Sequence, residues 1–203
     1  MLATLLARSQ DLGFLGAAPL LTHVAHAEAF LVATRANFPV GPLLDLGSGG
    51  GIPGLVVACR LPEVEIVLLE GGERRSQFLA GAVAELGLTD RVSVVAERAE
   101  LAGRRSELRH RFRTVLARGF GPPAVTAECA APLLGEQGQL IVSEPPPGSP
   151  TLDRWPVSGC DLLGLEVEEH VTEPFAFVRL RARRRCAERY PRRVGVPSKR
   201  PLF

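Results

Sequence analysis

Short apolar runs alternate with helical stretches between residues 43 and 143, and this alternation restricts the fold more than any other feature of the chain. Apolar runs at 43–46, 64–69, 92–96, 112–117 and 138–143 predict five strands, and helices are predicted over 53–60, 73–86 and 124–134. A continuous run such as Ile66-Val67-Leu68-Leu69 is typical of a parallel strand covered on both faces. The pattern therefore predicts an α/β fold with a doubly wound, mostly parallel sheet.

The two ends of the chain differ from this central part. Residues 1–38 are predicted to be helical with a break over 13–19, and Pro39-Val40-Gly41-Pro42 ends the helical run. Residues 162–171 and 175–180 predict a C-terminal antiparallel hairpin, which brings the expected sheet to seven strands. Residues 144–150 are predicted to form a rigid proline-rich loop. We expect an N-terminal helical segment over 1–40, the main domain over 41–185 and a basic tail over 186–203.

Charge and cysteine content exclude several classes of protein. The net charge of +2 does not indicate a nucleic-acid-binding protein. The segment from Arg179 to Arg200, however, contains nine Arg and one Lys but only one Glu. The four cysteines lie far apart, which predicts reduced thiols and no metal site. No apolar run is long enough to span a bilayer, and the N-terminus lacks the basic start of a secretory signal. We expect a cytoplasmic protein without a membrane or metal partner.

A glycine-rich turn directly follows the first predicted strand. Asp45 ends that strand, and Gly47, Gly49, Gly50 and Gly51 follow, so that the chain can turn tightly and a ligand can approach the backbone. The next acidic residue at a strand end is Glu70, whose carboxylate can accept hydrogen bonds from ribose hydroxyls. The spacing predicts a site for a nucleotide-type cofactor.

Two cofactors fit this glycine pattern, because it overlaps the dinucleotide fingerprint. Asp45 stands immediately before the loop, where it can reach the amino acid portion of S-adenosylmethionine through bound groups or water. Pro53 follows two residues after the last loop glycine. Both details favour S-adenosylmethionine over NAD.

Five segments together resemble the RsmG (GidB) methyltransferase family. They are the loop Asp45-Leu46-Gly47-Ser48-Gly49-Gly50-Gly51-Ile52-Pro53-Gly54, the helix start Glu73-Arg74-Arg75-Ser76-Gln77-Phe78-Leu79, Arg98-Ala99-Glu100, Ala117-Arg118-Gly119-Phe120 and the tail from Tyr190 to Leu202. The tail resembles the family's R-Y-P-R-x-x-G-x-P-x-K-x-P-L segment and is the most specific of the matches. Without the resemblance, Glu97 and Glu100 are expected to be surface charges at a helix start.

The resemblance implies a class I (Rossmann-like) methyltransferase fold and a bacterial enzyme that methylates N7 of a guanine in small-subunit ribosomal RNA. S-adenosylmethionine is the expected cofactor, and ribosomal RNA or a ribosomal particle is the expected partner. Arg118 is the predicted catalytic residue, near the methyl group and the incoming base. The predicted cofactor-binding residues are Asp45, Gly47, Ser48, Gly49, Gly51, Glu70, Ala99 and Glu100.

The arginine-rich tail is the main sequence evidence for RNA binding. Its cations can neutralise phosphates, and Tyr190 is available to stack on a base. A solvated terminal segment is the alternative interpretation. The predicted RNA-binding residues are Arg118, Arg192, Arg193, Lys199 and Arg200.

The chain departs from the family pattern at two places. Ser143-Glu144-Pro145 stands where the family usually has a Lys-Gly pair, and a glutamate beside an RNA phosphate would be repulsive. The family's N-terminal N-L-T segment has no counterpart in residues 16–22. His23 and His26 share one face of a predicted helix and are expected to be partly exposed.

The acceptor therefore stays open between several possibilities. Guanine N7 carries a lone pair and no proton, so its methylation needs no general base, and none is evident. The alternatives are a methyltransferase acting on a small molecule or another acceptor, a cofactor-binding paralogue without turnover, and an NAD-dependent dehydrogenase.

Overall fold

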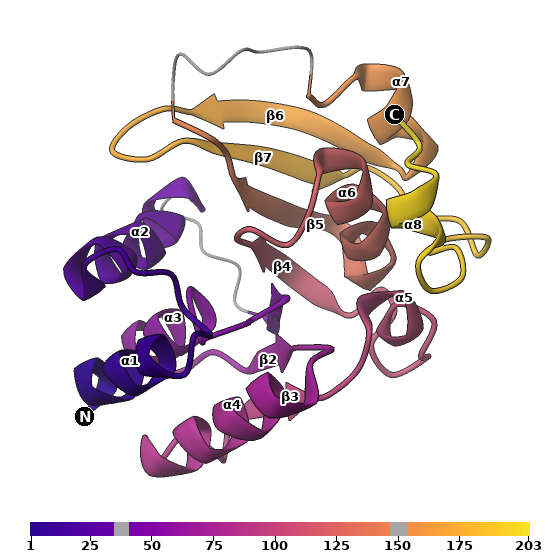
Figure 1. The fold of residues 1–203 in the computed structure, drawn as a ribbon. Coiled ribbons are helices and arrows are strands. Elements are labelled where there is room, and N and C mark those ends of the chain that lie inside the picture. Colours follow the sequence, from indigo (N-terminus) through magenta and orange to yellow (C-terminus); the bar gives the residue numbers. More distant parts are fainter. Residues whose placement is uncertain (35–40, 147–153) are drawn as a thin grey trace.

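The computed structural model describes residues 1–34, 41–146 and 154–203. Within these ranges, seven strands form one sheet in the order β3-β2-β1-β4-β5-β7-β6 (Figure 1). All neighbours are parallel except β5–β7 and β6–β7, which are antiparallel. The strands are β1 (Leu43–Leu46), β2 (Ile66–Leu69), β3 (Val92–Val95), β4 (Phe112–Ala117), β5 (Leu134–Ser143), β6 (Leu165–Val171) and β7 (Phe177–Ala182).

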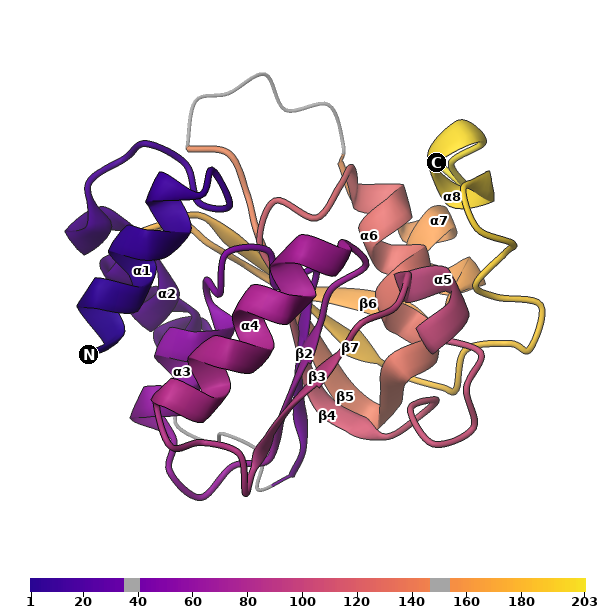
Figure 2. The ribbon, with the colours of Figure 1, turned by 60° about the horizontal axis from the view of Figure 1, so that its bottom comes forward.

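The helices lie on both faces of the sheet. Figure 2 shows α1 to α4 on one side and α5 to α8 on the other. The helices are α1 (Leu2–Asp11), α2 (Leu20–Ala33), α3 (Gly54–Arg60), α4 (Glu73–Glu85), α5 (Ala99–Ala102), α6 (Pro123–Ala130), the 3-10 turn η1 (Ala131–Leu133), α7 (Val157–Leu162) and α8 (Val196–Lys199). The predicted doubly wound sheet and the C-terminal hairpin are confirmed.

The continuous apolar strands arise because alternate side chains enter different cores. In β1, Leu44 and Leu46 pack with the α5–α8 side, whereas Leu43 packs with the α2–α4 side. A smaller cluster joins Leu6 of α1 and Ala27 of α2 to Val56 of α3. This cluster places the N-terminal helices beside the glycine turn.

Several predicted boundaries move in the structure. The helix predicted over 124–134 ends at Ala130, and β5 begins at Leu134, because Pro132 has no N–H with which to continue helical hydrogen bonding. The hairpin strand predicted from residue 162 begins at Leu165, after α7. The expected helix stop at Pro39 and Val40 and the Pro147–Pro150 part of the predicted rigid loop lie outside the described residues.

Candidate functional site

The glycine turn joins β1 to α3 with backbone angles that favour glycine. Gly47 has φ +72°, and a Cβ atom there would lie 2.6 Å from the Phe120 ring. Gly51 has φ +96°, and a Cβ atom there would collide with Cδ1 of Leu55. Side chains at these two positions would be strained by the positive φ angles and would require Phe120 and Leu55 to move, so the path of the turn favours glycine.

Asp45 lies behind this turn and is fully buried. Its Oδ2 accepts a hydrogen bond from the Gly54 N–H at 2.9 Å, which ties the end of the turn back to β1. Burial raises the pKa of Asp45 to about 7, although the Ser48 hydroxyl and the Gly54 amide oppose the shift. The Asp45 side chain has no exposed surface, and its expected contact with the cofactor stays a prediction.

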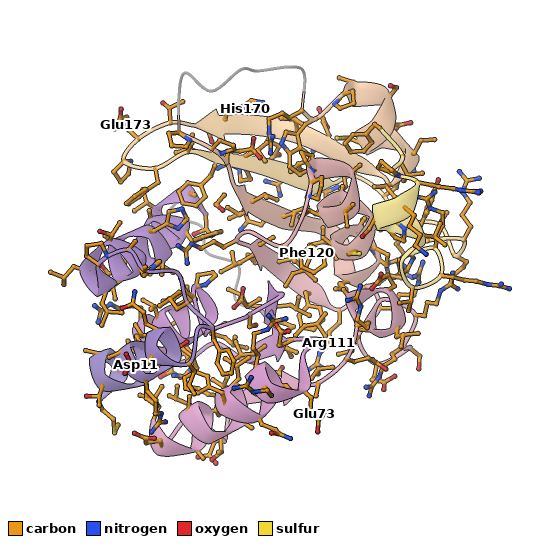
Figure 3. The ribbon with its side chains drawn as sticks, viewed as in Figure 1. Asp11, Glu73, Arg111, Phe120, His170 and Glu173 are labelled. Atoms are coloured by element: carbon orange, nitrogen blue, oxygen red, sulfur yellow. The ribbon has the colours of Figure 1, made fainter. Side chains whose placement is uncertain are left out.

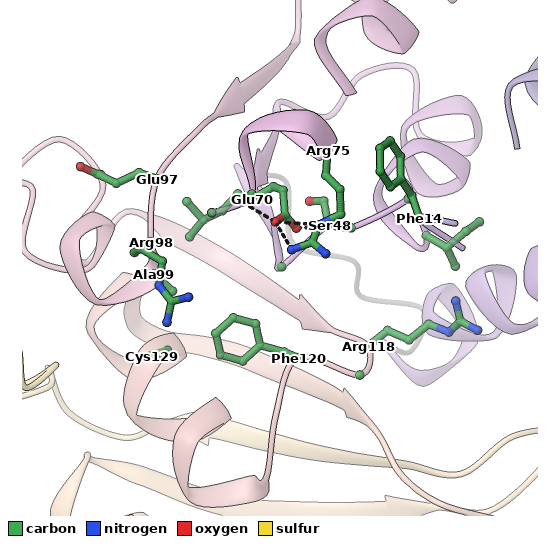
Figure 4. A pocket seen from close by; sticks show the side chains of 18 of the residues that line it. Phe14, Ser48, Glu70, Arg75, Glu97, Arg98, Ala99, Arg118, Phe120 and Cys129 are labelled. Atoms are coloured by element: carbon green, nitrogen blue, oxygen red, sulfur yellow. Dashed lines mark hydrogen bonds and ion pairs between the residues drawn. The ribbon is translucent and has the colours of Figure 1, made fainter. Parts of the chain in front are cut away.

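A pocket of about 530 Å³ opens above the turn, at the carboxyl ends of the parallel strands. Figure 4 shows Glu70, Arg98, Arg118 and Phe120 around it. Asp45 and Gly51 are predicted site residues that do not line it. The predicted residues that do line it are Gly47, Ser48, Gly49, Glu70, Ala99, Glu100 and Arg118.

Glu70 follows β2 and is only 4% exposed. Its Oε1 accepts hydrogen bonds from the Gly72 N–H at 2.7 Å and from Arg75 Nη2 at 2.8 Å, and its Oε2 accepts one from the Gly49 N–H at 2.9 Å. The dashed lines in Figure 4 mark the contact between Glu70 and Arg75. Since Oε1 is already crowded with donors, Oε2 is the oxygen best placed to accept a further hydrogen bond in the pocket.

Glu100 is also buried, at 4% exposure, so the surface position expected from the sequence alone is wrong. Its Oε1 accepts hydrogen bonds from the Gly195 N–H at 2.9 Å and from Arg98 Nη2 at 3.3 Å. Burial acts to raise the pKa of Glu100, but the hydrogen bond from Gly195 and the Arg98 side chain outweigh it, and the pKa is lowered. Glu100 therefore links the pocket to the C-terminal tail.

Arg118 follows β4 and is half-buried at the mouth of the pocket. Its Nη2 lies 2.9 Å from Nδ1 of His23 on α2. His23 is 4% exposed, and the expectation of a partly exposed residue is therefore wrong for it. His26 is partly buried, as expected, against the rings of Phe30, Phe175 and Phe177.

Sequence reasoning missed pocket residues from both ends of the chain. Phe14, Leu15 and Gly16 line the pocket from the connection between α1 and α2, and Ser198 lines it from α8. The predicted break over 13–19 located the first group without indicating its role. Figure 3 places Phe120 near the centre of the molecule, whereas Glu73 points outward from the start of α4.

The C-terminal tail is packed against the domain instead of extending as a free basic arm. Arg192 pairs with Glu128 of α6, and the Arg109 Nη1 atom donates to the Tyr190 carbonyl at 2.8 Å. Tyr190 is 6% exposed, so its predicted stacking on a base is wrong. Arg192 is committed to an internal ion pair. The predicted RNA-binding residues of the tail that are exposed are Arg193, Lys199 and Arg200.

Glu144, which replaces a family lysine, does not present an unbalanced negative charge. Arg154 Nε lies 2.7 Å from its Oε2, and Trp155 Nε1 donates to its Oε1 at 3.2 Å. Its side chain is 12% exposed, and it is not among the residues that line the pocket. The expected repulsion of a phosphate at the acceptor side is therefore not supported by its position.

The order of the strands and the pocket at their carboxyl ends are those of the class I methyltransferase fold. The antibiotic-resistance methyltransferase Kmr superposes with a TM-score of 0.57 at 15% identity, over 76% of this chain and 92% of that one. A sarcosine dimethylglycine methyltransferase from Galdieria sulphuraria, described as putative, gives 0.57 at 16% identity, over 74% of this chain and 64% of that one. At these identities the similarity concerns the fold alone.

Similarity in sequence is more specific than similarity in fold, and it shows the family of this chain. Residues 22–144 match the family described as GidB, rRNA small subunit methyltransferase G. The ribosomal RNA small subunit methyltransferase G of Thermotoga sp. (strain RQ2) is 39% identical over 169 residues, which is 80% of this chain and 72% of that protein. The protein of that name from Prochlorococcus marinus (strain NATL2A) is 33% identical over 78% of this chain and 66% of its own length. The chain belongs to this methyltransferase family, and it spans about two thirds of the length of the relatives it matches.

Two further structural findings bear on partners. In the described ranges, no helix is both long and apolar enough to cross a membrane. The same ranges contain no group of three or more His, Cys, Asp or Glu side chains that could hold a metal ion.

Proposed function

We propose that this chain transfers a methyl group from S-adenosylmethionine to N7 of a guanine in small-subunit ribosomal RNA. The main support for the proposal is that Glu70, which is buried beside the glycine turn, and Arg118, which lies at the mouth, line the same pocket. Membership of the rRNA small subunit methyltransferase G family supports the choice of acceptor.

The pocket fits the proposed cofactor in size and in chemistry. Its volume of about 530 Å³ is within the range of small-molecule sites. Glu70 Oε2 would accept a hydrogen bond from a ribose hydroxyl, and the backbone at Ser48 and Gly49 would face the amino acid portion. Ala99 would border the adenine, with Glu100 holding that wall in place through Gly195. Asp45 and Gly51 would act indirectly, by shaping the turn.

The protein's part in the reaction is to align donor and acceptor. S-adenosylmethionine supplies a methyl group that is already activated for in-line displacement. Guanine N7 has no proton to lose, so the site needs no general base. Orientation of two bound reactants can contribute about 7–11 kcal/mol in favourable cases. Arg118 would bind guanine O6 or a neighbouring phosphate through its planar guanidinium.

The tail would contact RNA through only part of its charge. Arg193, Lys199 and Arg200 are exposed and close in sequence to Ser198, which lines the pocket. We infer that they would neutralise phosphates that flank the target nucleotide. The proposed methyltransferase domain is 41–185, with the helical segment 1–40 and the tail 186–203 completing its pocket. We propose a cytoplasmic protein, because ribosomal subunits are its substrate.

Methyl transfer can be measured directly. Tritiated S-adenosylmethionine is incubated with the protein and with either free small-subunit RNA or assembled small-subunit particles, and labelled nucleosides are then identified. We expect label in N7-methylguanosine, and a slower but still measurable rate of labelling in Arg118→Ala with cofactor binding retained. Label confined to a small molecule or a protein would replace the RNA proposal. Tight cofactor binding with no acceptor would indicate a paralogue without turnover.

A further inference from the structure

The imidazole ring of His23 joins two sides of the pocket mouth. Its Nδ1 lies 2.9 Å from Arg118 Nη2, and its Nε2 lies 2.9 Å from the Gly16 carbonyl oxygen. Arg118 and Gly16 both line the pocket, although 102 residues separate them. Figure 4 shows the Arg118 side chain extending away from Phe120, toward the side of the N-terminal helices.

The partners of the ring determine where its proton lies. A guanidinium has only donors, so His23 Nδ1 must accept the hydrogen bond from Arg118. A carbonyl oxygen has only lone pairs, so His23 Nε2 must donate to Gly16. Both contacts are satisfied only by the neutral ring with its proton on Nε2. His23 therefore holds Arg118 as an acceptor, and a protonated ring could not make this contact.

The Gly16 side of this contact is fixed by a second residue. Gln10 Nε2 donates to the carbonyl oxygens of Gly16 at 2.6 Å and of Ala18 at 2.9 Å. Ser9 Oγ, one residue earlier on α1, donates to the Gly50 carbonyl of the glycine turn at 2.9 Å. The N-terminal segment is thus attached to the turn, and the ring of His23 connects that assembly to Arg118.

Among the described residues, no stronger contact competes for the Arg118 guanidinium. In the described part of the chain Arg118 makes no ion pair with a carboxylate, and the buried Asp45 acts on it only through its field. His23 is 4% exposed, so water does not readily replace its ring. The orientation of Arg118 therefore depends on the hydrogen bond to His23.

We propose that His23 is a positioning residue that sets the direction of the Arg118 guanidinium for the incoming base. The proposal rests on the proposed function, because it assigns Arg118 to the acceptor. His23 acts through Arg118 and the Gly16 segment and does not itself take part in methyl transfer. The N-terminal helical segment thereby contributes to acceptor alignment and not only to the core.

Two substitutions separate the two contacts of the ring. An Asn side chain places its amide oxygen near the position of Nδ1, so His23→Asn keeps an acceptor for Arg118. A Gln side chain places its amide near the position of Nε2, so His23→Gln keeps a donor for Gly16 and loses the contact with Arg118. Both variants contain a buried amide, which makes them matched in polarity.

The kinetic expectation follows from losing a hydrogen bond to a charged group. His23→Gln should lower kcat for RNA methylation by about tenfold, whereas His23→Asn should stay within about threefold of wild type. The Kd for S-adenosylmethionine, measured by calorimetry, should change less than about twofold in both. In an Arg118→Ala background, His23→Gln should have no further effect on kcat, because the two residues act as one unit.

Several outcomes would overturn the assignment. Equal activity of the Asn and Gln variants at equal thermal stability would leave His23 a merely structural residue, and so would additive losses in the Arg118→Ala background. If the wild-type protein methylates no RNA, the proposed function fails on its own. In that case the contact between His23 and Arg118 is tested by NMR of the Arg118 guanidinium nitrogens. Their signals should match those of wild type in His23→Asn and should shift in His23→Gln.

Discussion

Arg192 and Glu128 form a two-pronged ion pair whose carboxylate is completely buried. Arg192 Nε lies 2.9 Å from Oε1, and its Nη2 lies 2.6 Å from Oε2. The Arg192 backbone N–H also donates to Oε1 at 2.8 Å. This pair attaches the C-terminal tail to α6, on the same side of the sheet as Ser198 and Glu100. The tail is therefore part of the pocket wall.

Removing the arginine of this pair should be costly, because a buried carboxylate would lose its partner. We expect Arg192→Ala to lower the free energy of unfolding by about 3–5 kcal/mol in urea titration. Arg193→Ala is the control. Because the Arg193 side chain is exposed, this substitution should change the free energy of unfolding by less than about 0.5 kcal/mol. Equal effects of the two substitutions would contradict a docked tail.

The exposed cations of the tail should govern the salt dependence of RNA binding. We expect each of Arg193→Ala, Lys199→Ala and Arg200→Ala to weaken binding to small-subunit RNA. Each should also reduce the slope of log K against log salt by about one. The measurement is fluorescence anisotropy at several salt concentrations. Glu188→Gln, an exposed position before Tyr190, should not reduce the slope. Unchanged slopes in all three arginine and lysine variants would favour a solvated surface without an RNA role.

The negative charge of Glu70 should contribute to the affinity for S-adenosylmethionine. Glu70→Gln replaces a buried carboxylate that accepts from the Gly49 and Gly72 amides. We expect the Kd for S-adenosylmethionine to rise by about tenfold in calorimetry, since a hydrogen bond to a charged group is lost. Glu73→Gln, at an exposed position on α4, is the control and should bind like wild type. Wild-type affinity of the Glu70 variant would place the ribose elsewhere.

Asp45 should make the protein less stable as the pH rises. Its pKa is raised from 3.8 to about 7, so over that range the folded protein retains a proton that the unfolded chain has released. The free energy of unfolding should therefore fall as the pH increases from about 4 to 7, and Asp45→Asn should flatten this slope. Asp90→Asn, at an exposed position, should leave the slope unchanged. Urea titrations across this pH range measure the free energy of unfolding. A slope that Asp45→Asn does not change would refute the raised pKa of Asp45.

His26 should produce the opposite pH dependence. Burial, followed by the positive charge of the nearby Arg118, lowers its pKa from 6.5 to about 4, so the unfolded chain takes up a proton before the folded protein does. Stability should be lost as the pH falls through this range. His26→Phe should reduce that loss in thermal unfolding experiments, whereas His170→Gln, at an exposed position, should not. An acid-induced loss of the same size in His26→Phe would show that other groups cause it.

The order and type of the main elements were predictable because their patterns are local. Continuous apolar runs gave the parallel strands, and the Gly47–Gly51 turn with Glu70 one strand later gave the cofactor end of the candidate site. Short elements such as α7 and α8 were missed, since four to six residues carry too little periodicity to predict a helix.

Side-chain partnerships were less predictable. The sequence shows that Arg192 and Tyr190 stand in a basic tail, but not that one is paired with Glu128 and the other is buried. Likewise, nothing local to His23 indicates Arg118, because their contact depends on how α2 packs beside the end of β4.

By itself, the sequence determined the doubly wound sheet, the glycine turn and the family resemblance, since each is encoded in contiguous residues or fixed spacing. Only the tertiary structure decided which charges face the pocket and which are used internally. It buried Asp45, paired Arg192 with Glu128 and Glu144 with Arg154, and brought Gly16 and Ser198 to the pocket from opposite ends of the chain. The physical reason is that burial and ion pairing depend on segments far apart in sequence, whose proximity exists only after the sheet and its two helical layers have packed.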